Sequence, residues 1–190
     1  MKKLTAILLS IMMLLACVVT ASADDASYLG VMLGTNVMSL DTNLATDGDS
    51  FEVIADCIDD LMQMDKDGAA VPALAESFDV SDDGLTYTFH LRDAKWNNGT
   101  PVTANDFVFA WRRIAKDAGE YVYMLDEIGN IKVAAEIISG SEADLTTLAV
   151  SGPDEKTFVV ELNVPVSFFP SLMYVPTFYP INEELYNSLA

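Results

Sequence analysis

The sequence is poor in the residues that carry most metal and acid–base chemistry. Its 190 residues include one His and two Cys, and 10 Lys and Arg stand against 29 Asp and Glu. There is no HExxH, GxSxG or GxxxxGK[ST] motif, and two Cys cannot form a disulfide-dense scaffold or a CxxC metal site. The formal net charge of −19 excludes nucleic-acid binding, because affinity for phosphates comes mainly from Lys and Arg.

Hydrophobic residues, by contrast, make up 51% of the chain. A disordered acidic tail has too few of them to offset the entropy lost on ordering, so we expect a folded core. The length allows one domain or two small lobes. The sequence contains no internal repeat, low-complexity tract or coiled-coil heptad.

The first 23 residues have the three parts of a secretory signal peptide. Two lysines precede an almost unbroken apolar run over residues 4–19, and Ala21-Ser22-Ala23 is an A-x-A site for cleavage after Ala23. A transmembrane anchor is the alternative, but about 16 apolar residues fall short of the ~20 that span a bilayer. A lipoprotein signal with Cys17 as the lipidated N-terminus is a second alternative. The apolar residues that follow Cys17 favour cleavage after Ala23.

Cleavage after Ala23 would remove two lysines and no acid, which changes the formal net charge from −19 to −21. Cys57 would then be the only cysteine, so no intrachain disulfide could form. After an expected first strand over residues 28–38 and a polar loop over residues 43–49, Ser50 is the expected N-cap of a helix. Cys57 falls on the apolar stripe of that helix and is predicted to be a small buried hydrophobe.

Turn residues mark two hairpins in the rest of the chain. One joins residues 78–80 to residues 85–92 through Ser81-Asp82-Asp83-Gly84, and the other lies within residues 150–162. Strict alternation over residues 85–92 predicts one packed and one wetter face. His90 lies on the wetter face with two threonines and is interpreted as a sheet-surface residue.

Helical patterns lie between and after these hairpins. Thr103 and Asp106 form a capping-box-like start to a helix whose buried stripe includes Trp111. A second helix is expected over residues 126–138, and residues 182–190 begin another. Residues 71–76 are expected to be a connecting segment, and four prolines between residues 165 and 180 exclude long helices there.

Acidic pairs are too frequent for any one of them to indicate a site. Asp65, Asp67 and Glu76 have the overall spacing of a Ca²⁺ loop, but Gly stands at the fourth position instead of the sixth and Ala69 at the fifth, where an oxygen ligand is required. The segment is therefore interpreted as a surface turn.

Residues 71–113 resemble a known family. The resemblance is carried by Val71-Pro72-x-Leu74-Ala75-Glu76-Ser77-Phe78, by the run from Ser81 to Arg92, and by Ala94-Lys95-Trp96-x-x-Gly99-x-Pro101-Val102-Thr103-Ala104-x-Asp106-Phe107-Val108. This block is similar to the extracellular solute-binding proteins of family 5, the oligopeptide-binding type that serves ABC importers. Ser39-Leu40-Asp41 precedes it in the expected order, although Thr42 stands where the family has Pro.

The resemblance implies a mixed α/β lobe of the periplasmic-binding-protein type II kind, with an inserted small domain. Residues 24–59 would be the first segment of the main lobe, residues 60–182 the inserted domain, and residues 183–190 the start of the return to the main lobe. The second lobe, which family members carry, would be missing. We therefore expect a truncated product that binds its ligand weakly, if at all.

The resemblance also implies where a ligand would lie. A peptide would be held between lobes, and the loop after Leu40-Asp41 points to Thr46, Asp47 and Gly48. Tyr121 matches the position of an aromatic ligand contact, with Tyr123 as the substitute. A packing role for Tyr121 and a solvated loop position for Asp47 remain alternatives. No cofactor or metal is implied.

Four functions compete at this point. The first is peptide binding for an ABC importer, with peptide and permease subunits as partners and a monomer outside the cytoplasmic membrane. The second is the same role for another cargo, such as a nickel chelate, heme or a sugar. The third is a secreted acidic hydrolase, for which no nucleophile–base pair is present in the sequence. The fourth is an exported remnant with exposed apolar surface.

Overall fold

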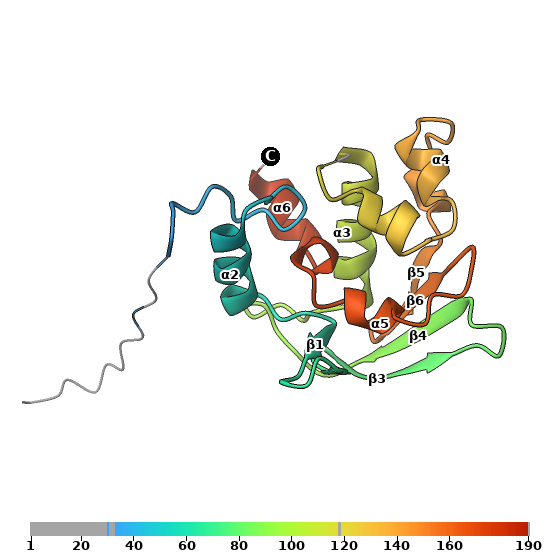
Figure 1. Ribbon diagram of the computed structural model, residues 1–190, viewed down its shortest axis with the longest axis horizontal. Coiled ribbons are helices and arrows are strands. Elements are labelled where there is room, and N and C mark those ends of the chain that lie inside the picture. The colour runs from blue at the N-terminus through green and yellow to red at the C-terminus, as the bar shows by residue number, and fades with distance from the viewer. Residues whose placement is uncertain (1–29, 31–32, 118, 190) are drawn as a thin grey trace, which may run out of the picture. The chain divides into compact units, whose positions relative to one another are not determined.

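A four-stranded antiparallel sheet is the base of the structure, a computed structural model that describes residues 30, 33–117 and 119–189 (Figure 1). Its strand order is β3-β4-β6-β5, so two hairpins lie side by side and their return strands pair in the middle. The strands are β3 (Ala75–Val80), β4 (Thr86–Leu91), β5 (Val150–Asp154) and β6 (Thr157–Glu161). Both predicted hairpins are therefore confirmed.

The first hairpin forms where its turn residues predict it. The turn is closed by Gly84 N–H donating to Ser81 O at 2.8 Å, and Gly84 has the positive φ of 71° that glycine adopts without strain. Along β4, Tyr87, Phe89 and Leu91 are buried while the residues between them are half-buried. The predicted packed and wetter faces are both present.

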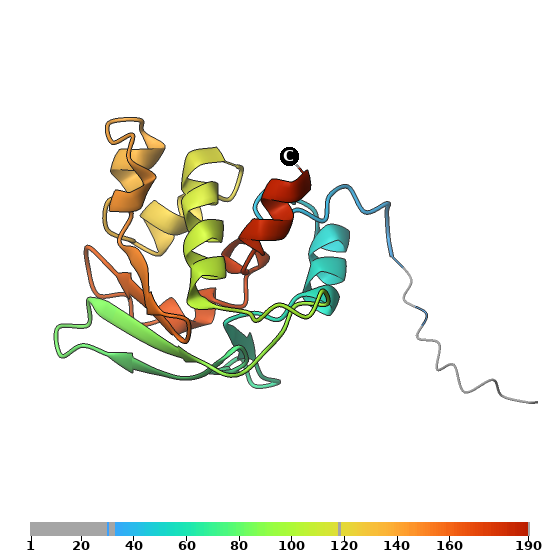
Figure 2. The ribbon, with the colours of Figure 1, turned by 180° about the vertical axis from the view of Figure 1, so that it is seen from behind.

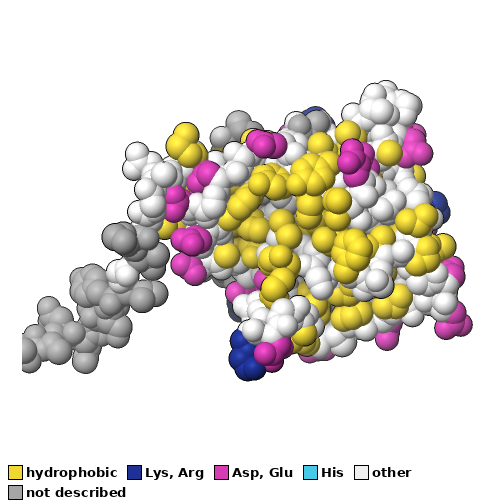
Figure 3. Space-filling model, viewed as in Figure 1, with side chains coloured by type: hydrophobic (Ala, Val, Ile, Leu, Met, Phe, Trp, Pro, Cys, Tyr) yellow, Lys and Arg dark blue, Asp and Glu magenta, His cyan; other side chains and the backbone are white. Residues whose placement is uncertain are grey.

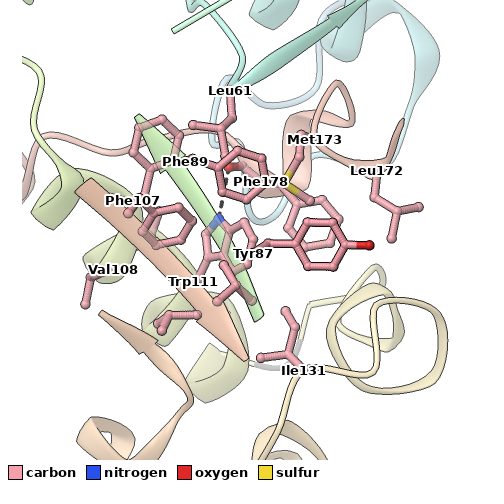
Figure 4. Packing of buried hydrophobic residues seen from close by; sticks show 14 of the residues in the cluster. Leu61, Tyr87, Phe89, Phe107, Val108, Trp111, Ile131, Leu172, Met173 and Phe178 are labelled. Carbon is pink, nitrogen blue, oxygen red and sulfur yellow. Dashed lines mark hydrogen bonds between the residues drawn. The ribbon is translucent and has the colours of Figure 1, made fainter. Parts of the chain in front are cut away.

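Helices cover the packed face of the sheet (Figure 2). Helix α3 (Ala104–Asp117) packs on β5 and β6, with the Phe107 and Trp111 rings 5.3 and 5.0 Å from that of Phe158. Its predicted start is confirmed, because the Asp106 carboxylate accepts from Thr103 N–H at 2.8 Å. The Trp111 indole N–H donates to Phe178 O at 3.0 Å, so the one polar atom of this core ring is satisfied (Figure 4).

The remaining elements are short. The proline-rich stretch contains only a one-turn helix and a 3₁₀ turn, as its composition predicts, and the expected final helix is present. These elements are α2 (Gly48–Cys57), the hairpin β1 (Met62–Met64) and β2 (Ala70–Pro72), η1 (Met124–Ile128), α4 (Ala134–Ile138), η2 (Leu145–Thr147), α5 (Phe169–Leu172), η3 (Pro176–Phe178) and α6 (Glu183–Leu189). The described residues from Gly34 onward pack as one compact unit.

The expected strand over residues 28–38 is wrong for the part that the structure describes. Residues 33–38 are irregular, and three of their amides bond to side chains of α2 instead of a neighbouring strand. Gly34 and Thr35 N–H donate to the Asp49 carboxylate at 3.0 and 2.8 Å, and Met38 N–H donates to Ser50 Oγ at 3.0 Å. The signal peptide and its Ala23 and Cys17 positions lie outside the described residues.

Two predictions about α2 are also wrong. The N-cap is Asp47, whose carboxylate accepts from Ser50 N–H at 2.9 Å, so the helix begins before the predicted cap Ser50. Cys57 is exposed, because it is the last helical residue and the chain turns extended at Ile58. The apolar stripe therefore ends there, and Leu61 reaches the core from outside the helix.

Two further segments differ from prediction. The expected helix over residues 126–138 is divided into the π-helix η1 and α4, because Ile131 forms a β-bridge with Leu162 and Lys132 N–H donates to Glu161 O at 3.0 Å. Residues 71–76, expected to be a connecting segment, contribute to β2 and β3. Residues Gln63 and Val71 pair in the small β1–β2 sheet, which forms around the predicted surface turn at Asp65 and Asp67.

Candidate ligand-binding site

An ion pair between a buried arginine and a half-buried aspartate fixes the loop in which the sequence predicts ligand contacts. The Arg113 guanidinium, from α3, donates to both carboxylate oxygens of Asp41 at 2.7 and 2.6 Å. Arg113 is 8% exposed, and its Nε also lies 3.1 Å from the Asp117 carboxylate. Its guanidinium carbon lies 4.7 Å from the centre of the Tyr186 ring, a cation–π distance. Arg113 therefore attaches the loop to α3.

The electrostatics of this pair favour its charged form. Burial alone would raise the pKa of Asp41, but the hydrogen bonds and charge of Arg113 outweigh it and hold that pKa below its ordinary value. The same bonds to Asp41 raise the pKa of Arg113 against the opposite effect of burial. A bidentate, charge-assisted pair of this kind fixes the orientation of the Asp41 carboxylate as well as its distance from the Arg113 guanidinium.

Asn43 carries the attachment from Asp41 into the loop. Its side chain accepts from Arg113 at 3.1 Å and donates to Thr177 O at 3.3 Å, and its N–H donates to Asp41 Oδ1 at 3.0 Å. Asn43 is 2% exposed. The loop therefore starts from a backbone that is bonded on three sides.

The predicted contacts Thr46, Asp47 and Gly48 follow this anchor. Thr46 and Gly48 are exposed, and Asp47 is half-buried. The Asp47 carboxylate accepts from the Ser50 N–H at 2.9 Å and from the Ser50 hydroxyl at 2.7 Å, so it has a structural role as the cap of α2. Thr46 and Gly48, on either side of it, are exposed to solvent.

The second predicted segment lies against the first. Tyr121 is half-buried, and its ring meets that of Phe51, in the first turn of α2, edge to face at 5.5 Å between centroids. Tyr123 is 39% exposed, with its ring 6.0 Å from that of Tyr121. The structure thus brings the loop at residues 46–48 and the tyrosines at 121 and 123 to one edge of the molecule. We call Phe51, Tyr121 and Tyr123 the aromatic cluster.

Sequence reasoning missed Phe51. Its position one residue after the expected helix cap carries no signal for ligand binding, and only its contact with Tyr121, 70 positions along the chain, reveals it. Figure 3 shows hydrophobic side chains gathered in the middle of one face, with acidic side chains mainly around its margin. Edge-to-face aromatic pairs of this geometry are favourable beyond the area they bury.

The described residues offer little metal chemistry. Within residues 33–117 and 119–189, no group of three or more His, Cys, Asp or Glu side chains could hold a metal ion. His90 lies on the open face of the sheet, 2.8 Å from the exposed Asp79 carboxylate. None of the helices in these ranges has the length and apolar character needed to cross a bilayer.

Comparison with known proteins decides the family. Residues 69–188 match the model of bacterial extracellular solute-binding proteins, family 5 Middle. The chain belongs to this family. The matched residues include both sheet hairpins, α3 and residues 119–129, which carry Tyr121, Tyr123 and η1 and which we call the tyrosine loop. The expected resemblance and the type of lobe are therefore confirmed.

Relatives in this family are much longer than the chain. It is 38% identical over 184 residues to a dipeptide-binding protein of Lactococcus lactis subsp. cremoris, and these residues cover 95% of this chain and 32% of the relative. It is 35% identical over 146 residues to the probable deoxycholate-binding periplasmic protein YgiS of Escherichia coli, 75% of this chain and 27% of that one. The solved structure of Haemophilus influenzae OppA in complex with RPPGFSPFR matches with a TM-score of 0.76 and 35% identity, over 80% of this chain and 30% of that one. The chain spans about three tenths of the length of these relatives.

Proposed function

We propose that this chain supplies one wall of the ligand cleft in an exported peptide-binding protein of an ABC-type importer. The family consists of solute-binding proteins, and relatives of this chain include a dipeptide-binding protein and an OppA in complex with RPPGFSPFR. The role requires no chemistry in the chain itself. It has a peptide as ligand and the permease subunits of the importer as partners.

The observation that carries this proposal is the meeting of two segments at one edge. Thr46 and Gly48 are exposed, and the aromatic cluster lies beside them, on α2 and on the loop after α3. Backbone groups can recognise any peptide, since every peptide offers the same N–H and C=O pattern. A tyrosine adds a stacking face and a hydroxyl. Together they suit a ligand whose backbone is constant and whose side chains vary.

Export is part of the same proposal. The lysines, apolar run and A-x-A site of the first 23 residues support a leader that is cleaved after Ala23, with lipidation at Cys17 as the alternative. Intact-mass measurement of the exported protein distinguishes them. An N-terminus at Asp24 supports cleavage after Ala23, whereas a lipid-modified N-terminal cysteine supports the alternative.

Calorimetric titration with an equimolar mixture of di- to pentapeptides tests the ligand. One cleft wall is expected to bind weakly, with a Kd on the order of 1 mM or above, because few contacts have to offset the cost of association. The variant Y121A/Y123A should lose this heat. The matched control is Tyr174→Ala, because Tyr174 is 39% exposed like Tyr123 but lies outside the aromatic cluster.

A second arm of the titration addresses the cargo. Deoxycholate is the appropriate competitor, since YgiS, a relative 35% identical over 146 residues, is named as a probable deoxycholate-binding protein. Binding of deoxycholate without binding of peptides would contradict the peptide proposal. Equal heats from the wild-type protein and Y121A/Y123A would contradict the proposed site.

A further inference from the structure

The loop that carries the two tyrosines is held at both ends by backbone contacts that leave no room for a side chain. At its start, a Cβ on Gly119 would lie 2.7 Å from the carbonyl oxygen of Asn43 and 3.4 Å from Leu44 Cδ2. The first distance is shorter than carbon and oxygen atoms tolerate without a bond between them. Glycine at position 119 is therefore what lets the loop lie directly against residues 43 and 44.

The Asn43 carbonyl cannot move away to accommodate a side chain. Asn43 is bonded to Arg113, Thr177 and Asp41, and the Asp41 carbonyl accepts from Leu44 N–H at 3.1 Å. A larger residue at position 119 must displace the tyrosine loop instead. Because Val122 N–H donates to Gly119 O at 2.9 Å, that displacement would reach the segment between the two tyrosines.

A second contact of the same kind closes the other end of the loop. Gly129 N–H donates to Met124 O at 2.9 Å, and a Cβ on Gly129 would lie 2.8 Å from that same oxygen and 3.3 Å from Leu125 O. Met124 N–H in turn donates to Tyr121 O at 3.0 Å. Two consecutive hydrogen bonds therefore connect Gly129 to the backbone of Tyr121.

The residues after Gly129 prevent the turn from relaxing outward. Ile131 N–H donates to Leu125 O at 2.9 Å, and both side chains are fully buried. Val133 has a φ of 71°, a strained region for a β-branched residue. Such strain persists only where the surroundings impose it, and here Lys132 is bonded through its N–H to Glu161 O and through its carbonyl to Ala149 N–H.

We propose that Gly119 and Gly129 are positioning residues for Tyr121. They set the distance between the tyrosine loop and α2, and so hold the Tyr121 ring against Phe51. Neither glycine is a ligand contact. The consequence for affinity rests on the proposed function, whereas the consequence for the ring contact does not.

The test compares Gly119→Ala and Gly129→Ala with Gly140→Ala in the purified protein. Gly140 has a φ of 76° and nothing within 4 Å of its Cβ position, so alanine there strains the backbone without touching the loop. The first readout is the NOE between the Phe51 and Tyr121 rings, measured without ligand. The second is the titration with the peptide mixture. The Trp111 indole N–H resonance reports whether the core of each variant is folded.

The two loop variants should lose most of the ring NOE and bind peptides roughly tenfold more weakly. Gly140→Ala should retain both properties, and each loop variant serves as the second test if the other does not fold. Wild-type intensity of the ring NOE in a folded Gly119→Ala or Gly129→Ala protein would overturn the positioning role. A wild-type protein that shows the ring NOE but binds no peptide would instead refute the proposed function alone.

Discussion

Two regions of the molecule are stabilised by different kinds of contact. One is the sheet with α3, and the other, which we call the edge, consists of residues 41–51 and 121–123 and carries the aromatic cluster. Around the sheet, Phe89, Phe158 and Trp111 are fully buried and pack in one continuous apolar cluster. At the edge, the small apolar cluster that includes Ile54 of α2 has three buried residues, and the Asp41–Arg113 pair and the Asp47 cap position the backbone. Apolar packing is insensitive to pH, whereas charged anchors are not. The candidate site therefore lies where the structure is most easily altered.

Trp111→Ala is expected to have the largest effect. It removes a fully buried ring and a hydrogen bond to Phe178 O, and the cavity should lower the free energy of unfolding by about 3–5 kcal/mol. Urea denaturation measures the loss. Val80→Ala, at a side chain that is 44% exposed, is the control and should cost little. A loss below about 1 kcal/mol for Trp111→Ala would contradict a core centred on α3.

Arg113→Met should come next, and its effect should be confined to the edge. It leaves the half-buried Asp41 carboxylate without its partner, at an expected cost of about 1.5–3 kcal/mol to the local stability of the edge. Native-state hydrogen exchange should show faster exchange of the Asn43 and Ala45 amides, with β4 and β6 unchanged. Lys132→Met breaks an exposed pair with Glu161 and should cost under about 1 kcal/mol. An equal increase in the exchange rates of the β4 and β6 amides would show that the sheet and the edge do not differ in how they are stabilised.

Asp60 should make stability depend on pH between 3.8 and about 6. Its carboxylate is 6% exposed, Oδ1 has no hydrogen-bond partner among the described residues, and burial, with a smaller contribution from Asp59, raises its pKa to about 6. Because the pKa of Asp60 is raised in the folded state, its contribution to the free energy of unfolding is fully present below the ordinary pKa of 3.8. That contribution is lost as the pH rises through about 6. Asp60→Asn should therefore stabilise the protein by about 2 kcal/mol at pH 7.5.

The same substitution should change little at pH 3.5, where both side chains are neutral. Thermal unfolding at the two pH values measures the difference. The pH dependence that Asp41 contributes has the opposite sign. Because the pKa of Asp41 is lowered in the folded state, its contribution to stability is present above 3.8 and is lost as the pH falls through the folded-state pKa. A destabilising Asp60→Asn at pH 7.5 would contradict the burial of an unpaired carboxylate.

Asp47→Ala should have the smallest effect of the four. Loss of the two bonds to Ser50 should cost about 1 kcal/mol and fray the first turn of α2. Helical amide exchange near Phe51 reports the fraying. Asp56→Ala, at an exposed position later in the same helix, is the control. If both variants behave alike, Asp47 is a solvated loop acid and not the cap.

What could be predicted from the sequence follows the same division. The sheet hairpins and α3 depend on signals within a few residues, such as Gly84 in its turn and Asp106 three positions after Thr103. Their apolar alternation then decides which face packs. Local sequence is sufficient here because the tertiary contacts agree with it.

The edge could be predicted only in part, because it depends on contacts between distant segments. Asp41 and Arg113 are 72 positions apart, and nothing in either segment marks them as a pair. Asp47 and Ser50 are both competent caps, and the tie of Ser50 Oγ to Met38 N–H decides between them. The family resemblance supplied the loop at residues 46–48 and the tyrosines, but Phe51 became visible only in the structure.

The measurement that tests the central claim most directly is a ¹H–¹⁵N correlation spectrum of the protein titrated with tripeptides. Binding across the two segments should shift the amide resonances of residues 45–51 and 120–124 together, with one shared Kd. Amides of β4 and β6 should stay in place. Shifts confined to one segment, or shifts centred elsewhere on the molecule, would contradict a peptide site formed where the two segments meet.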